Sequence, residues 1–389
     1  MINRPPRGFD DAEFHTRLLA AQRLMTERSL DALLLTTEPE IRYFTGFLTQ
    51  FWHSPTRPWF LLVPRACAPV AVIPEIGRPL METTWIEDVR SWESPAPEDE
   101  GVSLLARTIR EFLGATGRLG VPLGPETTVR MAAADFDRLR QLLGTVEITD
   151  ATDVVRSVRM VKSEAEIDKI RFVCAAASAA FDRVPGLVSP GDPLAEVFRR
   201  FQIELLAQGA DAVPFLVGGA GPGGYGDIIG PPADAPVRAG DVLMMDTGAM
   251  YDGYWCDFDR NYSIGAADDL TRRGYNTLWR ATEEAMSVAR PGATCADLFR
   301  AMQKVIVEDG FSCGDVGRMG HGLGMQLTEW PSHRPDDHTV IEAGMVLTLE
   351  PSLWLAPGRS LVHEENLVVR GSGIELLTTR APRDIPELG

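Results

Sequence analysis

The sequence predicts an α+β protein of two domains: a smaller N-terminal α/β domain, and a C-terminal domain in which helices cover antiparallel strands. Three observations predict this fold class. The chain has 389 residues, 44% of them hydrophobic, which is enough for two separate cores. Single helical and strand patterns alternate in the N-terminal part. In the C-terminal part, pairs of helical patterns alternate with runs that are typical of antiparallel strands.

The N-terminal domain, residues 1–157, begins with apolar positions at helical spacing over residues 11–28. Short apolar runs then predict strands at Ala32–Thr36, in WFLLVP and in APVAVIP. Helical patterns at 102–114 and 126–143 follow, with the short apolar runs GRLGVP and VEIT after them. This alternation indicates one α/β unit.

The C-terminal domain, residues 158–389, begins near a capping-box pattern in which Ser163 precedes Glu166 by three residues. Such a pattern starts a helix, and a long apolar periodicity follows it. Helical patterns lie at about 164–185, 193–208, 268–289 and 295–309, with strands between and after them.

Two aspartates lie on strands that a tight turn joins. VLMMDTGAM carries Asp246 and GYWCDFDRNY carries Asp257, and Asp252-Gly253 between them is a hairpin signal. A turn centred between Tyr251 and Asp252 places Asp246 opposite Asp257 on one face, with Cβ atoms roughly 4.5–5.5 Å apart. Two bare carboxylates at that distance repel each other. A pair of bridging divalent cations would remove the conflict.

Three further candidate ligands follow along the chain. His321 lies in MGHGLGMQ, where glycines on both sides allow the backbone to approach a metal or substrate closely. Glu350 ends the apolar run MVLTLEP, and Glu364 begins the strand EENLVV. Glu365 would point to the opposite face of that strand. Spacing alone does not decide which of the two points inward, and Glu364 is the expected ligand.

These segments, together with VRMVKSEAEIDKIR, resemble the successive signatures of the pita-bread metallopeptidase family. That family includes methionine aminopeptidase, Xaa-Pro aminopeptidase, prolidase and the metal-free relative creatinase. The resemblance covers about residues 150–380, and more loosely the whole two-domain layout. It implies a C-terminal pita-bread fold preceded by a creatinase/prolidase-like N-terminal domain. It also implies a homodimer that acts on a small molecule or dipeptide.

The resemblance further implies a hydrolase with two divalent metal ions. Oxygen-rich ligands with one nitrogen suit Mn²⁺ best, with Co²⁺, Fe²⁺ or Zn²⁺ as alternatives. Glu350 is the implied acid/base residue and acts beside His321. The implied metal ligands are Asp246, Asp257, His321, Glu350 and Glu364.

The chain departs from the Xaa-Pro-cleaving relatives at two positions. Those relatives usually carry a histidine seven residues after the ligand histidine, where this chain has Thr328 followed by Glu329. They also usually carry one about seventeen residues before the first aspartate, where this chain has Ile229. Thr328 and Glu329 are kept as candidate substrate-binding residues. His333 is a candidate replacement for a missing imidazole, and an exposed loop histidine is the alternative.

These departures leave the reaction open among three classes. The first is hydrolysis of a small amide, dipeptide or modified amino acid by an enzyme of the Xaa-Pro peptidase/prolidase-like type, with Xaa-Pro dipeptides themselves as poor substrates. The second is a metal-dependent lyase that acts on a small zwitterion such as dimethylsulfoniopropionate. The third is a non-catalytic binding module on the same fold, which the complete ligand set disfavours because a module needs no activated water.

A second group of candidates lies in TGFLTQFWHSPTRPWF. In creatinase-like dimers the N-terminal domain of one subunit closes the active site of the other. Trp52, His53, Arg57 and Trp59 would then supply aromatic walls for a cation and an arginine for a carboxylate. The alternative is that the tryptophans are core residues and that Arg57 is a surface charge.

Composition excludes several classes of partner. The net charge of −17 argues against nucleic acid and against an anionic membrane surface. Five cysteines without a CxxC pair argue against disulfides and a zinc knuckle, and predict a cytoplasmic protein. No apolar signal core and no apolar stretch of about 18 residues is present, so neither export nor a membrane span is expected.

Overall fold

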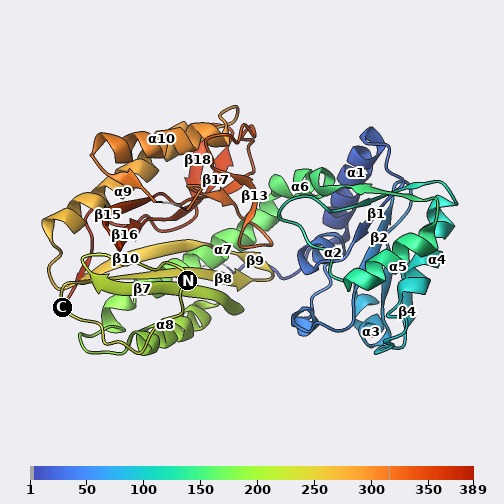
Figure 1. The fold of residues 1–389 in the computed structure, drawn as a ribbon, viewed down its shortest axis with the longest axis horizontal. Coiled ribbons are helices and arrows are strands. Elements are labelled where there is room, and N and C mark those ends of the chain that lie inside the picture. Colours follow the sequence, from blue (N-terminus) through green and yellow to red (C-terminus); the bar gives the residue numbers. More distant parts are fainter. Residues whose placement is uncertain (1–3, 315) are drawn as a thin grey trace. The chain divides into compact units, whose positions relative to one another are not determined.

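The computed structural model describes residues 4–314 and 316–389, which form two compact units (Figure 1). One unit comprises Arg7–Arg159, and the other combines residues 4–6 with Met160–Gly389. The predicted boundary after residue 157 falls inside helix α6 (Thr152–Met160).

The N-terminal unit is built on a six-stranded mixed sheet in the order β4-β3-β2-β1-β5-β6. Strand β2 pairs antiparallel with β1 and β3, and the remaining pairs are parallel. The strands are β1 (Ala32–Leu35), β2 (Phe60–Pro64), β3 (Val70–Pro74), β4 (Asp88–Trp92), β5 (Arg118–Val121) and β6 (Glu147–Asp150).

Helices cover both faces of this sheet, and strands alternate with helices along the chain as predicted (Figure 1). Alternate strand residues such as Leu34, Leu62 and Val72 pack against α4 and α5. The predicted helix at 126–143 is too long, because the chain before Ala133 is a loop whose Arg130 amide donates to Thr36 Oγ1. The helices are α1 (Asp11–Glu27), α2 (Glu38–Thr45), α3 (Arg78–Met81), α4 (Val102–Leu113) and α5 (Ala133–Leu143), with short 3-10 turns at Gln50–His53 and Glu75–Gly77.

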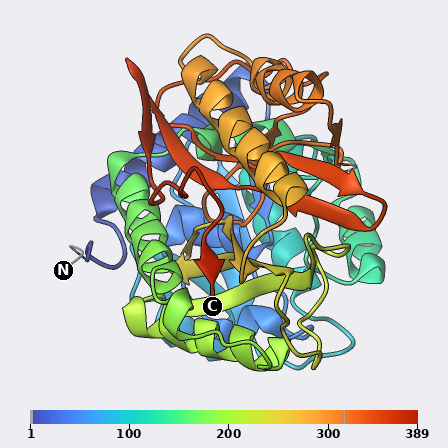
Figure 2. The ribbon, with the colours of Figure 1, turned by 90° about the vertical axis from the view of Figure 1, so that its left-hand side faces the viewer.

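Two pairs of helices enclose the strands of the C-terminal unit. Figures 1 and 2 show α9 and α10 on one side of these strands and α7 and α8 on the other. The predicted capping box is confirmed: Ser163 and Glu166 bond reciprocally at the start of α7. The helices are α7 (Glu164–Phe181), α8 (Leu194–Gln208), α9 (Asp269–Val288) and α10 (Cys295–Glu308), with a 3-10 turn at Val184–Gly186.

Among the described residues, the strands of the C-terminal unit form three sheets. Their orders are β19-β10-β8-β7 with β9 beside β8, then β13-β12-β14-β17-β18, and β11-β15-β16. The first sheet comprises β7 (Ala212–Pro222), β8 (Asp241–Tyr251), β9 (Tyr254–Trp255), β10 (Phe258–Ile264) and β19 (Glu387–Leu388). The second comprises β12 (His321–Gly322), β13 (Glu329–Ser332), β14 (Val346–Leu349), β17 (Glu365–Arg370) and β18 (Gly373–Leu376). The third comprises β11 (Ser312–Cys313), β15 (Ser352–Ala356) and β16 (Arg359–Val362).

The hairpin of β8 and β10 forms, but its predicted register is wrong by two residues. Asp246 lies opposite Asp259, not opposite Asp257. The turn is centred on Asp252 and Gly253, which have φ angles of 47° and 79°, one residue later than expected. Two positive φ angles in succession are typical of the tight hairpin turn that Asp-Gly favours. Because the shift is an even number of residues, Asp257 is still expected on the face that carries Asp246.

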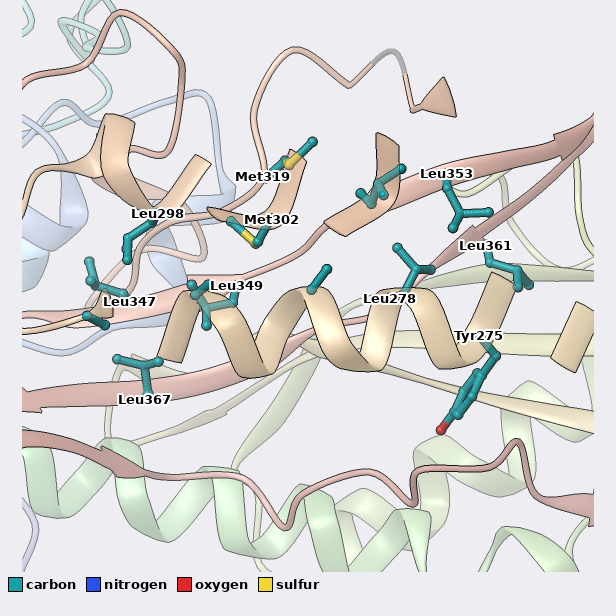
Figure 3. Close-up of a cluster of buried hydrophobic side chains, with 14 of the residues drawn as sticks. Tyr275, Leu278, Leu298, Met302, Met319, Leu347, Leu349, Leu353, Leu361 and Leu367 are labelled. Carbon is teal, nitrogen blue, oxygen red and sulfur yellow. The ribbon is translucent and has the colours of Figure 1, made fainter. Parts of the chain in front are cut away.

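Strands β14 and β17 separate the helical core from the candidate site. Figure 3 shows Leu347, Leu349 and Leu367 of these strands in the buried cluster that α9 and α10 complete. Thr348 and Asn366, which pair across the two strands, alternate with these leucines. The polar pair therefore faces away from the helices, toward the predicted ligands.

Candidate metal centre

The five predicted ligands come from the two larger sheets of the C-terminal unit. Asp246 lies within β8 and Asp257 immediately precedes β10. His321 begins β12, Glu350 follows β14, and Glu364 precedes β17. Four of the five thus sit at strand ends, where a strand fixes the backbone and leaves the side chain free to turn inward.

The structure brings three of these side chains into one cluster. Ligand atoms of Asp257, His321 and Glu364 all lie within 4.8 Å of one another, and all three residues are buried. His321 Nε2 is 3.4 Å from Asp257 Oδ2 and 3.9 Å from Glu350 Oε2. The distances suit groups that converge on a cation between them.

The imidazole of His321 is oriented for ligation through Nε2. Its Nδ1 lies 2.8 Å from the carbonyl oxygen of Gly322, and only an N–H can bond to a carbonyl. In the neutral ring the Nε2 lone pair then faces Asp257 and Glu350. Burial opposes protonation of this ring, but Glu350 and Asp257 outweigh burial and raise the pKa of His321.

The carboxylates of the centre repel one another in the absence of a cation. Burial, followed by the charge of Asp257, raises the pKa of Asp246 and of Glu364 well above the ordinary values. Burial likewise raises the pKa of Asp257 to about 6, although His321 opposes the shift. Asp246 Oδ1 and Glu364 Oε1 are buried without a hydrogen-bond partner among the described residues. Buried oxygens without a donor are what a pair of divalent ions would satisfy, so the residues fit the implied metals.

Two residues of β14 and β17 hold the ligands in place. Thr348 Oγ1 accepts from the backbone N–H of His321 at 3.1 Å. Asn366 binds the backbone of Asp257 twice: its Oδ1 accepts from Asp257 N at 2.9 Å, and its Nδ2 donates to the Asp257 carbonyl oxygen. Both are the polar residues that strand alternation turns toward the centre.

Glu365 is engaged elsewhere, which leaves Glu364 as the better candidate ligand. Arg260 and Arg380 contact the Glu365 carboxylate at 2.9 and 3.0 Å, and Thr378 also donates to it. Burial alone would raise the pKa of Glu365, but Arg260, His363 and Arg380 hold it well below the ordinary value. His363 belongs to this network through Arg380.

Asp259 is a further acid of the centre that the predicted register concealed. It is buried opposite Asp246, and burial raises its pKa to about 8. Its Oδ2 accepts from Asn261 Nδ2 at 2.6 Å, while Oδ1 has no partner among the described residues. The alternation in CDFD could have revealed it, because residues two apart in a strand share a face.

The other predicted residues of this unit are placed differently. The carboxylate of Glu329 lies 3.1 Å from Lys162 Nζ in a buried pair, so it is not free to bind substrate. Ile229 is exposed, whereas Thr328 lies beside Arg318. His333 is buried and not exposed, and a Cβ on Gly320 would collide with its ring. Burial lowers the pKa of His333 to about 3.

The four candidates from the N-terminal segment lie in the other unit. Trp52 and Trp59 are buried and pack on each other and on Phe47. They are therefore core residues, which was the alternative to a role in substrate binding. Arg57 is half-buried with its guanidinium over Phe51, and His53 is exposed. Their approach to a partner's active site remains a prediction.

Comparison with known proteins decides the family. Residues 168–371 match metallopeptidase family M24, and residues 17–161 match the creatinase/prolidase N-terminal domain. This chain belongs to metallopeptidase family M24. It is a metallo-hydrolase, and the predicted pita-bread and creatinase-like domains are confirmed.

Relatives of this M24 chain include dipeptidases and Xaa-Pro dipeptidases. It is 30% identical to the probable dipeptidase PepE of Mycobacterium tuberculosis, over 93% of each chain. It is 26% identical to the Xaa-Pro dipeptidase of Pyrococcus horikoshii, over 91% of this chain and 94% of the relative. Its structure resembles dipeptidase PepE from Mycobacterium ulcerans with a TM-score of 0.85 and 29% identity, covering 98% of this chain and 99% of the other. Across the described residues, none of the M24 chain's helices has the length and apolar character that a bilayer crossing demands.

Proposed function

We propose that this chain is a two-metal dipeptidase that does not depend on proline in its substrate. The observation that carries the proposal is the convergence of Asp257, His321 and Glu364 within 4.8 Å. Unpartnered oxygens on Asp246 and Glu364 support it, because they supply further donors at the same place. The similarity to dipeptidase PepE over 93% of the chain supports dipeptides as the substrate class.

The proposed ligands are Asp246, Asp257, His321, Glu350 and Glu364, with Mn²⁺ as the proposed ion. Bound there, two divalent ions would lower the pKa of a water molecule and polarise the scissile carbonyl. The chain's own contribution is to fix the donors: Asn366 anchors Asp257, and the Gly322 carbonyl selects the Nε2-binding form of His321.

Glu350 is the proposed acid/base residue. Its side chain is 21% exposed, whereas those of Asp257 and His321 are 6% and 2% exposed. Glu350 is therefore more open to incoming water and substrate than Asp257 or His321. A carboxylate in that place can accept the proton of the attacking water and deliver it to the leaving amine.

Proline independence rests on Thr328 and Ile229. The resemblance implies that relatives which cleave Xaa-Pro bonds usually carry imidazoles at these two positions, and this chain carries none there. A homodimer and a cytoplasmic location complete the proposal, and they rest on the resemblance and on the unpaired cysteines.

The experiment is a substrate panel with the metal-loaded protein. The chain is stripped with a chelator and reloaded with Mn²⁺, and the release of free amino acids from Ala-Leu, Gly-Leu and Gly-Pro is followed. We expect turnover of the first two, slow turnover of Gly-Pro, and none with Asp257→Asn. Efficient cleavage of Gly-Pro would overturn proline independence. No amino acid release, with acrylate formed from dimethylsulfoniopropionate instead, would replace the dipeptidase with the lyase.

A further inference from the structure

Arg318 is a cation that lies beside the candidate metal centre and that the sequence reasoning missed. Its Nε is 3.5 Å from Glu350 Oε1, and one terminal nitrogen is 3.4 Å from Thr328 Oγ1. Its side chain is 28% exposed, and that of the neighbouring Glu350 is 21% exposed. Arg318 therefore lies on the side from which solvent reaches Glu350.

The two contacts that Arg318 makes with described residues are long for an arginine that serves only to neutralise a carboxylate. Strong guanidinium–carboxylate pairs have donor–acceptor distances of about 2.7–2.9 Å and often use two nitrogens. Glu365, by contrast, lies 2.9 Å from Arg260 and 3.0 Å from Arg380 in the same unit. A guanidinium carries five N–H donors in a planar fork, so Arg318 has donors left for another anion.

The position of Arg318 beside Glu350 suits the C-terminal carboxylate of a bound dipeptide. In a dipeptide the scissile carbonyl and the terminal carboxylate are one residue apart, which spans about 3.3–3.6 Å of chain. A carbonyl held among the ligands thus places its carboxylate beside whatever group adjoins them. Arg318 adjoins Glu350 on the exposed side, and Thr328 adds a hydroxyl to the same place.

We propose that Arg318, assisted by Thr328, binds the free α-carboxylate of the substrate and restricts hydrolysis to dipeptides with an unblocked C-terminus. The inference rests on the proposed dipeptidase function and names its substrate-anchoring residue. Longer peptides and C-terminal amides place no carboxylate at this position and are poor substrates for the same reason.

The test compares Ala-Leu with Ala-leucinamide in wild type, Arg318→Met and Arg318→Lys, each loaded with Mn²⁺. A lost charge-assisted contact lowers kcat/KM for Ala-Leu by about 10- to 100-fold through KM, with a smaller loss for the lysine variant. The already slow turnover of Ala-leucinamide changes less than about threefold, because the amide has no charge to lose. Metal content stays at the wild-type value. Arg300→Met, which removes an exposed arginine paired with Asp297 on α10, is the control and changes none of these quantities.

Equal losses with both substrates, or loss of bound metal in Arg318→Met, would overturn the proposal that Arg318 binds the substrate carboxylate. Either result would show that Arg318 only supports Glu350. A binding measurement separates this proposal from the dipeptidase proposal, because binding needs no turnover. Leucine and leucinamide are titrated separately into each protein by calorimetry, and their affinities are compared. If Arg318→Met weakens the binding of leucine but not that of leucinamide, Arg318 binds the carboxylate even where the dipeptidase activity fails. If leucine binds to wild type and to Arg318→Met with the same affinity, the proposed role of Arg318 is wrong.

Discussion

The side chain of Asn366 binds both the backbone N–H and the backbone carbonyl of Asp257. Asp257 lies in the gap between β9 and β10, where neither strand includes it. Asn366 comes from β17 of the neighbouring sheet and is fully buried. One amide thus replaces the strand pairing that Asp257 lacks, and ties a ligand from one sheet to the sheet that supplies Glu364.

Asn366→Ala is predicted to weaken both the fold and metal binding. It leaves a buried N–H and a buried carbonyl without partners, which costs about 1–3 kcal/mol for each unsatisfied group. Asn366→Asp keeps the acceptor but loses the donor and adds a buried acid beside Asp257, so it should destabilise the fold at least as much as Asn366→Ala. Urea denaturation and Mn²⁺ titration measure the two effects. A wild-type Mn²⁺ affinity in Asn366→Ala would show that the amide does not position Asp257.

Glu364→Gln and Glu365→Gln are predicted to have opposite effects. Glu364→Gln should lose bound metal while the metal-free protein keeps or gains stability, because a repelled buried carboxylate is removed. Glu365→Gln should keep the metal but lose about 3–5 kcal/mol, because Arg260 and Arg380 are left with an uncompensated buried charge. Elemental analysis measures the metal bound by each variant, and denaturation measures its stability. The reverse pattern would make Glu365 the ligand.

Metal binding is predicted to weaken as the pH falls through about 6. The pKa of Asp257 is raised from 3.8 to about 6, so protons compete with the ion below that pH. This group alone lowers Mn²⁺ affinity about fourfold between pH 7.5 and 5.5. Calorimetric titration at the two pH values provides the measurement. An affinity independent of pH would mean that Asp257 does not titrate at the centre.

The same raised pKa fixes the sign of a stability change in the metal-free protein. The folded state binds the Asp257 proton more tightly than the unfolded state. Protonated Asp257 therefore adds to the free energy of unfolding below about pH 4, and this contribution is lost as the pH rises to about 6. Compared with Asp257→Asn, metal-free wild type should lose about 2 kcal/mol between pH 4 and pH 6. Denaturation of both proteins from pH 4 to 7 cancels the titration of other groups. A difference that grows in favour of wild type with rising pH would contradict the assignment.

Glu329 is predicted to stabilise the fold without binding substrate. Its buried pair with Lys162 is broken in Glu329→Gln, which should cost about 3–5 kcal/mol and leave KM unchanged. In the double variant with Lys162→Met, the losses should be less than additive. Denaturation and steady-state kinetics measure these effects. A raised KM with full stability would return Glu329 to the substrate site.

Local patterns in the sequence predicted most of the fold and the order of the candidate ligands. Period-two and helical spacing located the strands and helices, and the capping box at Ser163 located the start of α7. The register of β8 and β10 was missed by two residues because the sequence does not state where a turn is centred. That error hid Asp259 but kept Asp246 and Asp257 on one predicted face, since side chains alternate with a period of two.

Contacts between segments far apart in the chain could not be predicted from the sequence. Nothing in the spacing places Lys162 against Glu329, or Arg318 beside Glu350. The same holds for Trp59, whose burial depends on aromatic neighbours and not on its own segment. Strand alternation did separate Glu364 from Glu365, but only the arginines around Glu365 give a physical reason for the choice.

We propose that these buried acids share a site because they hold two cations. Elemental analysis of the chain after Mn²⁺ loading and extensive buffer exchange measures this. We expect close to two manganese ions per chain in wild type, and a marked loss in Asp257→Asn at unchanged folding. A wild-type protein that is correctly folded and retains no divalent metal would contradict it.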